Sequence, residues 1–167
     1  AFRFSDAANA IYHFVWHELC DWYIELAKPH LHQPEGIEQD AARAAKRHVV
    51  QGVLATALET TMRLLHPFAP YVTEEIWQKL PKRGGEAASV TLAAFPAAVP
   101  EWGDLDADRQ VAYLQEIVST IRTIRSERSV PPSRKITAIV DESDPQARTL
   151  IETYAPYIRQ LAGLEVL

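Results

Sequence analysis

Three side chains that could bind a metal ion recur at helical spacing near the start of the chain. His13, His17 and Asp21 are four residues apart, so in an α-helix they share one face. Two imidazoles one turn apart can bind zinc, and a carboxylate one turn further could be a third ligand. The pattern is not His-Glu-x-x-His, because Glu18 follows the second histidine. The alternative is that these are ordinary surface or hydrogen-bonded groups on a mostly apolar helix.

Two groups of basic residues could bind the phosphates of a nucleic acid. One group is Arg43, Lys46, Arg47 and His48; the other is Arg122, Arg125, Arg128, Arg134 and Lys135. Each group could also be the solvated face of a helix. The formal net charge of −5 argues against general nucleic-acid binding, because the average field repels phosphate. Any contact with a nucleic acid must therefore be local.

Aromatic side chains and the single cysteine lie in the same segment as the histidines. Tyr12, Trp16 and Tyr23 could stack on bases, but their helical spacing favours packing in a core. Cys20 belongs to the same row, where a thiol behaves as a small hydrophobic group rather than a nucleophile. One cysteine excludes an internal disulfide and a multi-cysteine zinc site.

Several functional classes lack their sequence signals. No apolar run reaches membrane-spanning length, and the N-terminus lacks the features of a secretory signal, so we expect a cytoplasmic protein with no membrane partner. Gly84-Gly85 lacks the context of a phosphate-binding loop, and no Gly-x-Ser-x-Gly sequence occurs. We assign no catalytic, cofactor-binding or metal-binding residue.

The first half of the chain predicts long helices. A helix over 5–28, with Ser5 as its cap and Pro29 as its end, has two apolar rows rather than one. We therefore expect it to be the central rod of a helical bundle, covered on most sides. A second helix, over 37–66, is predicted to pack against it.

The remaining pattern predicts a corner at Pro67 and Pro70, then a short helix capped by Thr73. An irregular loop, 82–103, has a possible strand at 89–92. A helix over 105–128 is followed by a strand at 135–141, a helix capped by Asp144, and a strand at 164–167. We expect a mainly α fold, with a helical bundle over 1–130 and a small α/β subdomain over 131–167.

Three sequence runs resemble valyl-tRNA synthetases, a family of class I aminoacyl-tRNA synthetases. The first is the helix over 4–28, with Leu19-Cys20-Asp21-Trp22-Tyr23-Ile24-Glu25-x-x-Lys28. The second is Leu65-His66-Pro67-Phe68-Ala69-Pro70-Tyr71-Val72-Thr73-Glu74-Glu75-Ile76-Trp77. The third is Ile121-Arg122-x-Ile124-Arg125 with Val130-Pro131-Pro132. The resemblance covers nearly the whole chain.

The resemblance implies an anticodon-binding helical bundle, followed by the start of a region that leads to a C-terminal coiled coil. The family's catalytic sequences, His-Ile-Gly-His and Lys-Met-Ser-Lys-Ser, are absent, so we expect a fragment with no ligase activity and no cofactor of its own. The parent enzyme would use ATP and magnesium to join valine to its tRNA. The expected partners are the anticodon loop of valine tRNA and the catalytic domain of the same parent chain.

The resemblance also suggests which residues meet the tRNA. By analogy with the related methionyl enzyme, the turn holding Lys28 and His30 would face the anticodon, and Arg43, Lys46 and Arg47 beside it could meet phosphates. The alternative for each residue is a solvated helix end. The stripe of Arg122, Arg125 and Arg128 is a second choice. We expect Asp21, Glu25 and Arg63 to make polar contacts inside the bundle.

Overall fold

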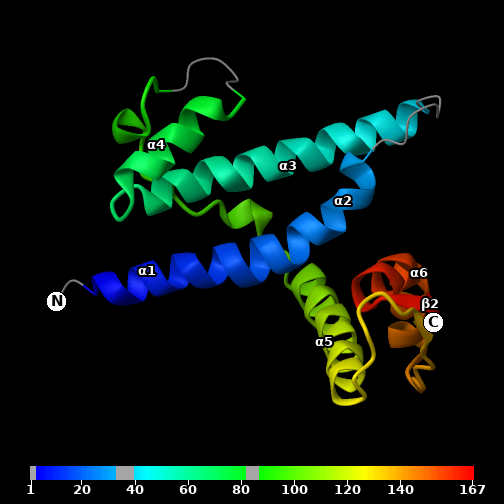
Figure 1. Ribbon diagram of the computed structural model, residues 1–167. Helices are drawn as coiled ribbons and strands as arrows, with labels where there is room; N and C mark the ends of the chain where they lie inside the picture. Colours follow the sequence, from blue (N-terminus) through cyan, green and yellow to red (C-terminus); the bar gives the residue numbers. More distant parts are fainter. Residues whose placement is uncertain (1–2, 33–39, 82–86) are drawn as a thin grey trace. The chain divides into compact units, whose positions relative to one another are not determined.

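The computed structural model describes residues 3–32, 40–81 and 87–167 (Figure 1). The chain is mainly helical, as predicted, with one two-stranded sheet among the described residues. It forms two compact units, Ala1–Ala98 and Val99–Leu167, and each is described by itself. The predicted helix over 105–128 belongs to the second unit, whereas we had grouped it with the bundle. The division into functional domains at 130 stays a prediction.

The first helical stretch runs without a break from Phe4 to Leu31. It consists of α1 (Phe4–His13), the π-helix η1 (Phe14–Ile24) and α2 (Glu25–Leu31). The predicted cap at Ser5 is wrong, because the helix begins at Phe4 and Arg3 occupies the cap position without a side-chain hydrogen bond. The predicted end at Lys28 is also wrong. Pro29 lies inside α2, and the His32 amide still donates to the Lys28 carbonyl at 2.9 Å. Pro29 therefore lacks its own backbone N–H donor but does not end the helix.

The second long helix, α3 (Ala41–Leu65), contacts both α1 and α2, which confirms the predicted packing. Asp40 caps it, and its side chain accepts a hydrogen bond from the Ala42 amide at 3.2 Å. The predicted start at residue 37 lies outside the described residues. Tyr23 ties the two helices together, since its hydroxyl donates to the Val50 carbonyl at 3.3 Å.

The prediction that the first helix is a covered central rod is wrong. Only Leu19 and Ala27 are buried in it, whereas Tyr12 is 61% exposed and Trp16 is 54% exposed. The unit's main core lies elsewhere, where Met62 of α3 packs with Trp77 and Val90. One neighbouring helix can cover only part of the first helix, so Tyr12 and Trp16 remain open to solvent.

The third helix of the first unit, α4 (Pro70–Lys79), begins with a proline in its first turn. Thr73 does not cap this helix, as we had predicted. It is fully buried within the helix, where its hydroxyl donates to the Ala69 carbonyl at 2.8 Å. Because the Thr73 hydroxyl proton is used in this bond, the hydroxyl oxygen accepts a hydrogen bond from His66 Nδ1 at 2.8 Å. The other ring nitrogen, His66 Nε2, contacts the Thr91 hydroxyl at 2.9 Å.

Glu74 of α4 binds the segment that begins at residue 87. Its Oε2 accepts hydrogen bonds from the Ser89 hydroxyl at 2.8 Å and the Val90 amide at 3.0 Å. The predicted strand at 89–92 is instead the 3₁₀-helix η2 (Val90–Leu92), in which Val90 enters the core. The physical reason is that α4 supplies side-chain partners here, and no neighbouring strand is available in the described structure.

We predict that Glu74→Ala releases residues 87–93 from α4. Hydrogen bonds from Gln78 and Ser89 hold the pKa of Glu74 below its usual value, so the ionised form is the one that binds the segment. Amide exchange of residues 87–93 should accelerate in the variant, and in the wild type when pH falls through that lowered pKa. Glu75→Ala is the matched control, because Glu75 is exposed and pairs only with Lys79 in the described interactions. Equal protection in both variants would contradict the prediction.

The second unit contains two helices and the small sheet. After the 3₁₀-helix η3 (Pro100–Trp102), α5 (Leu105–Glu127) starts at Asp104, whose side chain accepts from two backbone amides at 3.0 Å. α6 (Pro145–Ala162) is capped by Asp144, as predicted, and contains Pro156. Strand β1 (Ile136–Thr137) is shorter than the predicted 135–141 and pairs in parallel with β2 (Leu164–Val166).

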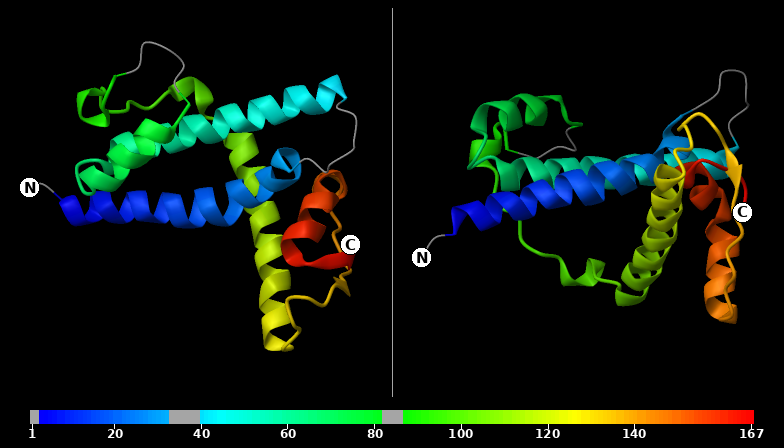
Figure 2. Two further views of the ribbon diagram at one scale, coloured as in Figure 1. Left: turned by 45° about the horizontal axis from the view of Figure 1, so that its top comes forward. Right: turned by 60° about the horizontal axis from the view of Figure 1, so that its bottom comes forward.

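The helices α5 and α6 lie side by side with their C-terminal ends together (Figure 2). At those ends, Arg122 Nε donates to the Leu161 carbonyl at 3.0 Å. At the other ends, the Tyr113 hydroxyl donates to Glu142 Oε2 at 2.5 Å, which raises the pKa of Tyr113 to about 12. The core between the helices is formed by buried aliphatic side chains: Val118, Ile121, Ile151, Ile158, Ala162 and Leu164.

The sequence predicted no segment long and apolar enough to span a membrane. In the described part of the chain, every helix is either too short or too polar to span a bilayer.

Candidate nucleic-acid interface

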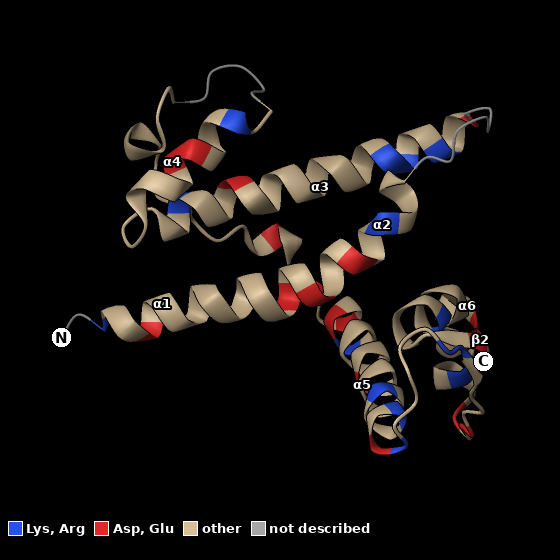
Figure 3. Ribbon diagram, viewed as in Figure 1, with Lys and Arg blue, Asp and Glu red and all other residues tan. Residues whose placement is uncertain are grey.

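The predicted tRNA-binding residues come from the end of α2 and the first turns of α3. Arg43, Lys46 and Arg47 follow each other at steps of three and one, so they occupy one face of α3. Arg43 and Lys46 are exposed, whereas Arg47 is half-buried. Because α2 packs against α3, the end of α2 is held beside this face, and Figure 3 shows blue Lys and Arg positions on both helices in this region.

The positive charges on this face of α3 act on His30 of α2. Burial lowers its pKa first, and the positive charges of Lys46 and Arg43 lower it further. The charge effect requires both cations to lie near the imidazole. The structure therefore brings His30, Arg43 and Lys46 together, with Arg47 on the same face of α3. We call these four residues the α2–α3 basic cluster.

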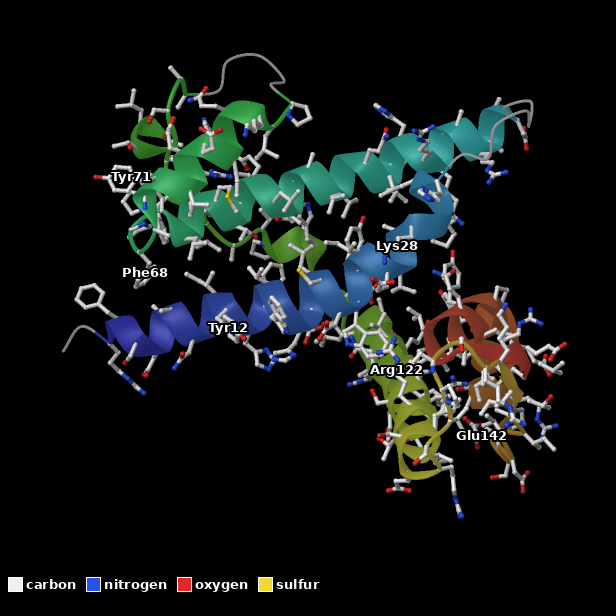
Figure 4. The ribbon with its side chains drawn as sticks, in the orientation of Figure 1. Tyr12, Lys28, Phe68, Tyr71, Arg122 and Glu142 are labelled. Carbon is white, nitrogen blue, oxygen red and sulfur yellow. The ribbon has the colours of Figure 1, made fainter. Side chains whose placement is uncertain are left out.

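Lys28 occupies a different side of α2. Residues two apart on a helix do not face each other, so Lys28 and His30 project in different directions. The Lys28 ammonium lies 2.5 Å from Glu25 Oε1, and its side chain is 57% exposed (Figure 4). Lys28 is available to solvent beside the α2–α3 basic cluster but is not one of its members.

The second-choice stripe on α5 does not form a solvent-facing cation surface. Arg125 is only 8% exposed, and its guanidinium donates to the carbonyls of Gly163, Pro131 and Arg134 at 2.9, 3.1 and 2.9 Å. Arg122, labelled in Figure 4, also donates to a carbonyl of the neighbouring helix. Sequence spacing shows which cations share a helix face, but it cannot show that the face meets carbonyl oxygens.

The residues expected inside the bundle have mixed positions. Arg63 links α3 to the segment after η2, since it donates to Glu59 at 2.8 Å and to the Ala94 carbonyl at 3.2 Å. Asp21 is exposed and lies 3.4 Å from His17 Nδ1. Glu25 pairs with Lys28. Arg63 therefore joins separate segments of the unit, as expected of a contact inside the bundle.

The metal-site alternative receives no support from the geometry. The rings of His13 and His17 lie in contact, with centroids 4.8 Å apart, and Asp21 approaches only His17. Among the described residues, no group of three His, Cys, Asp or Glu side chains could hold a metal ion. Cys20 is half-buried.

The aromatic row differs from its prediction. Tyr12 and Trp16 are exposed, and their rings are nearly parallel, with an interplanar angle of 5° and centroids 6.2 Å apart. Figure 4 shows Tyr12 on the first helix. Tyr23 instead faces α3, and burial raises its pKa. Helical spacing alone could not predict that Tyr12 and Trp16 are exposed while Tyr23 faces α3, because all three belong to the same row.

Comparison with known families decides the class of this bundle. Residues 1–140 match the family described as the anticodon-binding domain of tRNA ligase. The chain belongs to this family. The anticodon-binding domain includes the first unit and continues through α5 to residue 140 of the second unit.

Similar full-length proteins point to one kind of ligase. The chain is 41% identical to valine–tRNA ligase from Geobacter sulfurreducens over 98% of its own length and 18% of that protein. It is 40% identical to valine–tRNA ligase from Aquifex aeolicus over 98% of this chain and 14% of that protein. It is 37% identical to the Bacillus subtilis valine–tRNA ligase over 99% of this chain and 18% of that protein. The chain thus spans less than a fifth of the length of these relatives.

We predict that tRNA binding to the anticodon-binding domain takes up a proton at His30. In the free domain, burial and two cations lower the pKa of His30, so the folded state favours the neutral imidazole. The stability that this preference gives is present above the ordinary histidine pKa and is lost as pH falls through the lowered pKa. Phosphates placed against Lys46 and Arg43 would offset those charges and raise the pKa again. Affinity should therefore rise as pH falls from about 7.5 to about 6. Titrations of wild type and His30→Gln would check this, since an unchanged pH dependence in the variant would exclude His30.

Proposed function

We propose that this chain binds the anticodon loop of valine tRNA and positions that tRNA for aminoacylation by the catalytic domain of the same synthetase. The observation that carries the proposal is the match of residues 1–140 to anticodon-binding domains. Valine is the proposed amino acid because the compared relatives are named valine–tRNA ligases.

The α2–α3 basic cluster is the proposed contact with the loop, together with Lys28. Anticodon bases are unpaired, so a protein can splay them out, stack on their faces and read their edges. Cations beside such bases bind the backbone and fix its position. Arg43 and Lys46 are suited to this role because they are exposed, lie on one helix face and sit near the start of α3.

The local concentration of cations explains how an acidic chain could bind RNA. The net charge is −5, yet Arg43, Lys46 and Arg47 occur within five residues, preceded by Lys28 and His30 on the packed helix. Phosphate binding depends on charges within about 8–10 Å at ordinary ionic strength, so distant acids contribute little. The sign of the local charge therefore decides the interaction.

The chemistry of ligation is assigned to the rest of the proposed synthetase. We infer that its catalytic domain uses ATP and magnesium, and that the chain described here holds neither a cofactor nor a catalytic residue. The proposed site is cytoplasmic, where the tRNA substrate is found.

The decisive experiment compares tRNAs that differ only in the anticodon. The chain would be titrated with valine tRNA and with the same tRNA changed at the second and third anticodon bases. We expect at least about 10-fold weaker binding of the changed tRNA, since each mismatched recognition contact is worth about 1–3 kcal/mol. Equal affinity for both tRNAs would reject anticodon recognition by this chain.

A further inference from the structure

The second unit carries a separate group of cations at one end. Arg128 ends α5, Arg134 and Lys135 precede β1, and Arg159 lies in the last turn of α6. All four side chains are exposed. We call these four residues the basic end. Arg128, Arg134 and Lys135 belong to the second group of basic residues noted in the sequence, and Arg128 was part of the second-choice stripe on α5, whereas Arg159 was in neither.

Buried Arg125 brings the segments of the basic end together. Its guanidinium holds the carbonyls of Arg134 and Gly163, at 2.9 Å each, and that of Pro131 at 3.1 Å. Gly163 in turn caps α6 by donating its amide to the Arg159 carbonyl. Because one side chain ties these loops to the end of α5, the backbone segments that carry the four exposed cations lie together at one end of the unit.

Helix-end electrostatics do not account for this group. Cations near helix C-termini stabilise the macrodipole, which could explain Arg128 and Arg159. Arg134 and Lys135, however, lie outside both helices. The carbonyls gathered at this end are already paired with the buried Arg125, so they do not require the exposed side chains.

The charges of the basic end are also not neutralised by carboxylates. Among the residues that the structure describes, no carboxylate oxygen lies within 4 Å of Arg128, Arg134, Lys135 or Arg159. Asp104, Asp144 and Glu142 lie at the opposite ends of the helices, where they cap α5 and α6 or accept from Tyr113. Glu127 and Glu165 lie at the same end as the four cations but form no ion pair with them in the described structure, so this end keeps an excess of positive charge.

We propose that the basic end is a second RNA contact that binds the sugar–phosphate backbone of the tRNA recognised by the first unit. This inference rests on the proposed function. Exposed, unneutralised cations gain free energy from phosphate by releasing condensed counterions. Such contacts carry no sequence information, so they would strengthen binding of any tRNA and leave base discrimination to the first unit. Linking two contacts in one chain raises the affinity further, because the second contact forms at high effective concentration.

The test compares two double variants of the whole chain. Arg128→Gln with Lys135→Gln removes two charges from the basic end. Lys79→Gln with Arg109→Gln is the control, since it removes the same number of charges from exposed ion pairs elsewhere. Each protein would be titrated at several salt concentrations with valine tRNA and with the anticodon-changed tRNA. Thermal unfolding would establish that both variants remain folded.

We expect the basic-end variant to bind both tRNAs about 10-fold more weakly than the control does. The slope of log affinity against log salt should decrease in magnitude by about 1 for each phosphate that the variant no longer binds. Affinities and slopes equal to those of the control would overturn the inference, and would indicate that these cations face another partner, such as an acidic protein.

The two proposals fail in different ways. If the wild type discriminates between the tRNAs but the two variants bind alike, only the second contact is rejected. If the wild type does not discriminate but the basic-end variant loses affinity and slope, anticodon recognition is rejected and backbone binding stands. A wild type that binds neither tRNA would reject both.

Discussion

Replacing Arg43, Lys46 and Arg47 together with Ala is expected to weaken binding of valine tRNA by about 100-fold at about 0.1 M salt. The three side chains share one face of α3, next to His30 at the end of α2. Their removal leaves the loop phosphates without the cations that release counterions. The salt dependence should fall in the same experiment, since each contact to a single-stranded loop contributes about 0.7 to the slope.

The matched control removes three other cations. Arg3, Lys79 and Arg109 each pair with a nearby acid on an exposed helix face, so Ala at these positions changes the net charge equally. In a synthetase that contains the chain, valine activation should survive the Arg43, Lys46 and Arg47 changes while aminoacylation is lost. If tRNA affinity remains that of the control, the α2–α3 basic cluster is not the interface.

Replacing Arg125 with Met is expected to destabilise the second unit by about 3–5 kcal/mol. Met fills much of the volume of the Arg side chain but cannot donate to the three carbonyls that Arg125 binds. These carbonyls belong to Gly163 and to the segment that leads into β1. A loss of this size is a large fraction of the stability of a domain, which is about 5–15 kcal/mol in total.

The effect should be confined to the unit that contains Arg125. Amide exchange of α6 and β2 should lose protection in the Met variant, whereas exchange of α3 in the first unit should stay as it is. Arg122→Met provides the comparison, because Arg122 lies one turn earlier on α5 and is exposed. We expect a smaller loss there, since an exposed group is partly solvated in the folded state. Similar losses in both variants would contradict the role assigned to Arg125.

The second sequence run that resembles valyl-tRNA synthetases now has a structural account. His66, Thr73 and Glu74 form a hydrogen-bonded group that joins the corner before α4 to residues 89–91. From the sequence, we had interpreted Thr73 as the cap of this helix. That interpretation was wrong because the helix begins at Pro70. The partners of His66 lie 7 and 25 residues away in the chain, beyond the range of any local signal.

The sequence by itself determined the features that depend on neighbouring residues. Asp104 and Asp144 each place an acceptor just before a helix, Pro145 suits the first turn, and Gly163 accepts the left-handed conformation, with φ 66°, that ends α6. These preferences act within one or two turns, so α5 and α6 occur where they were predicted. The family was also evident from the chain alone, because its signatures are continuous runs of residues.

Only the tertiary structure decided which apolar or charged faces are covered. Two rows of apolar residues on the first helix predicted burial, yet Tyr12 and Trp16 are exposed because α3 covers a single stripe. Arg125 looked like one of three equivalent surface cations, but the carbonyls of Pro131, Arg134 and Gly163 enclose it. Periodicity fixes the direction in which a side chain projects from its helix, whereas burial depends on neighbours supplied by distant parts of the chain.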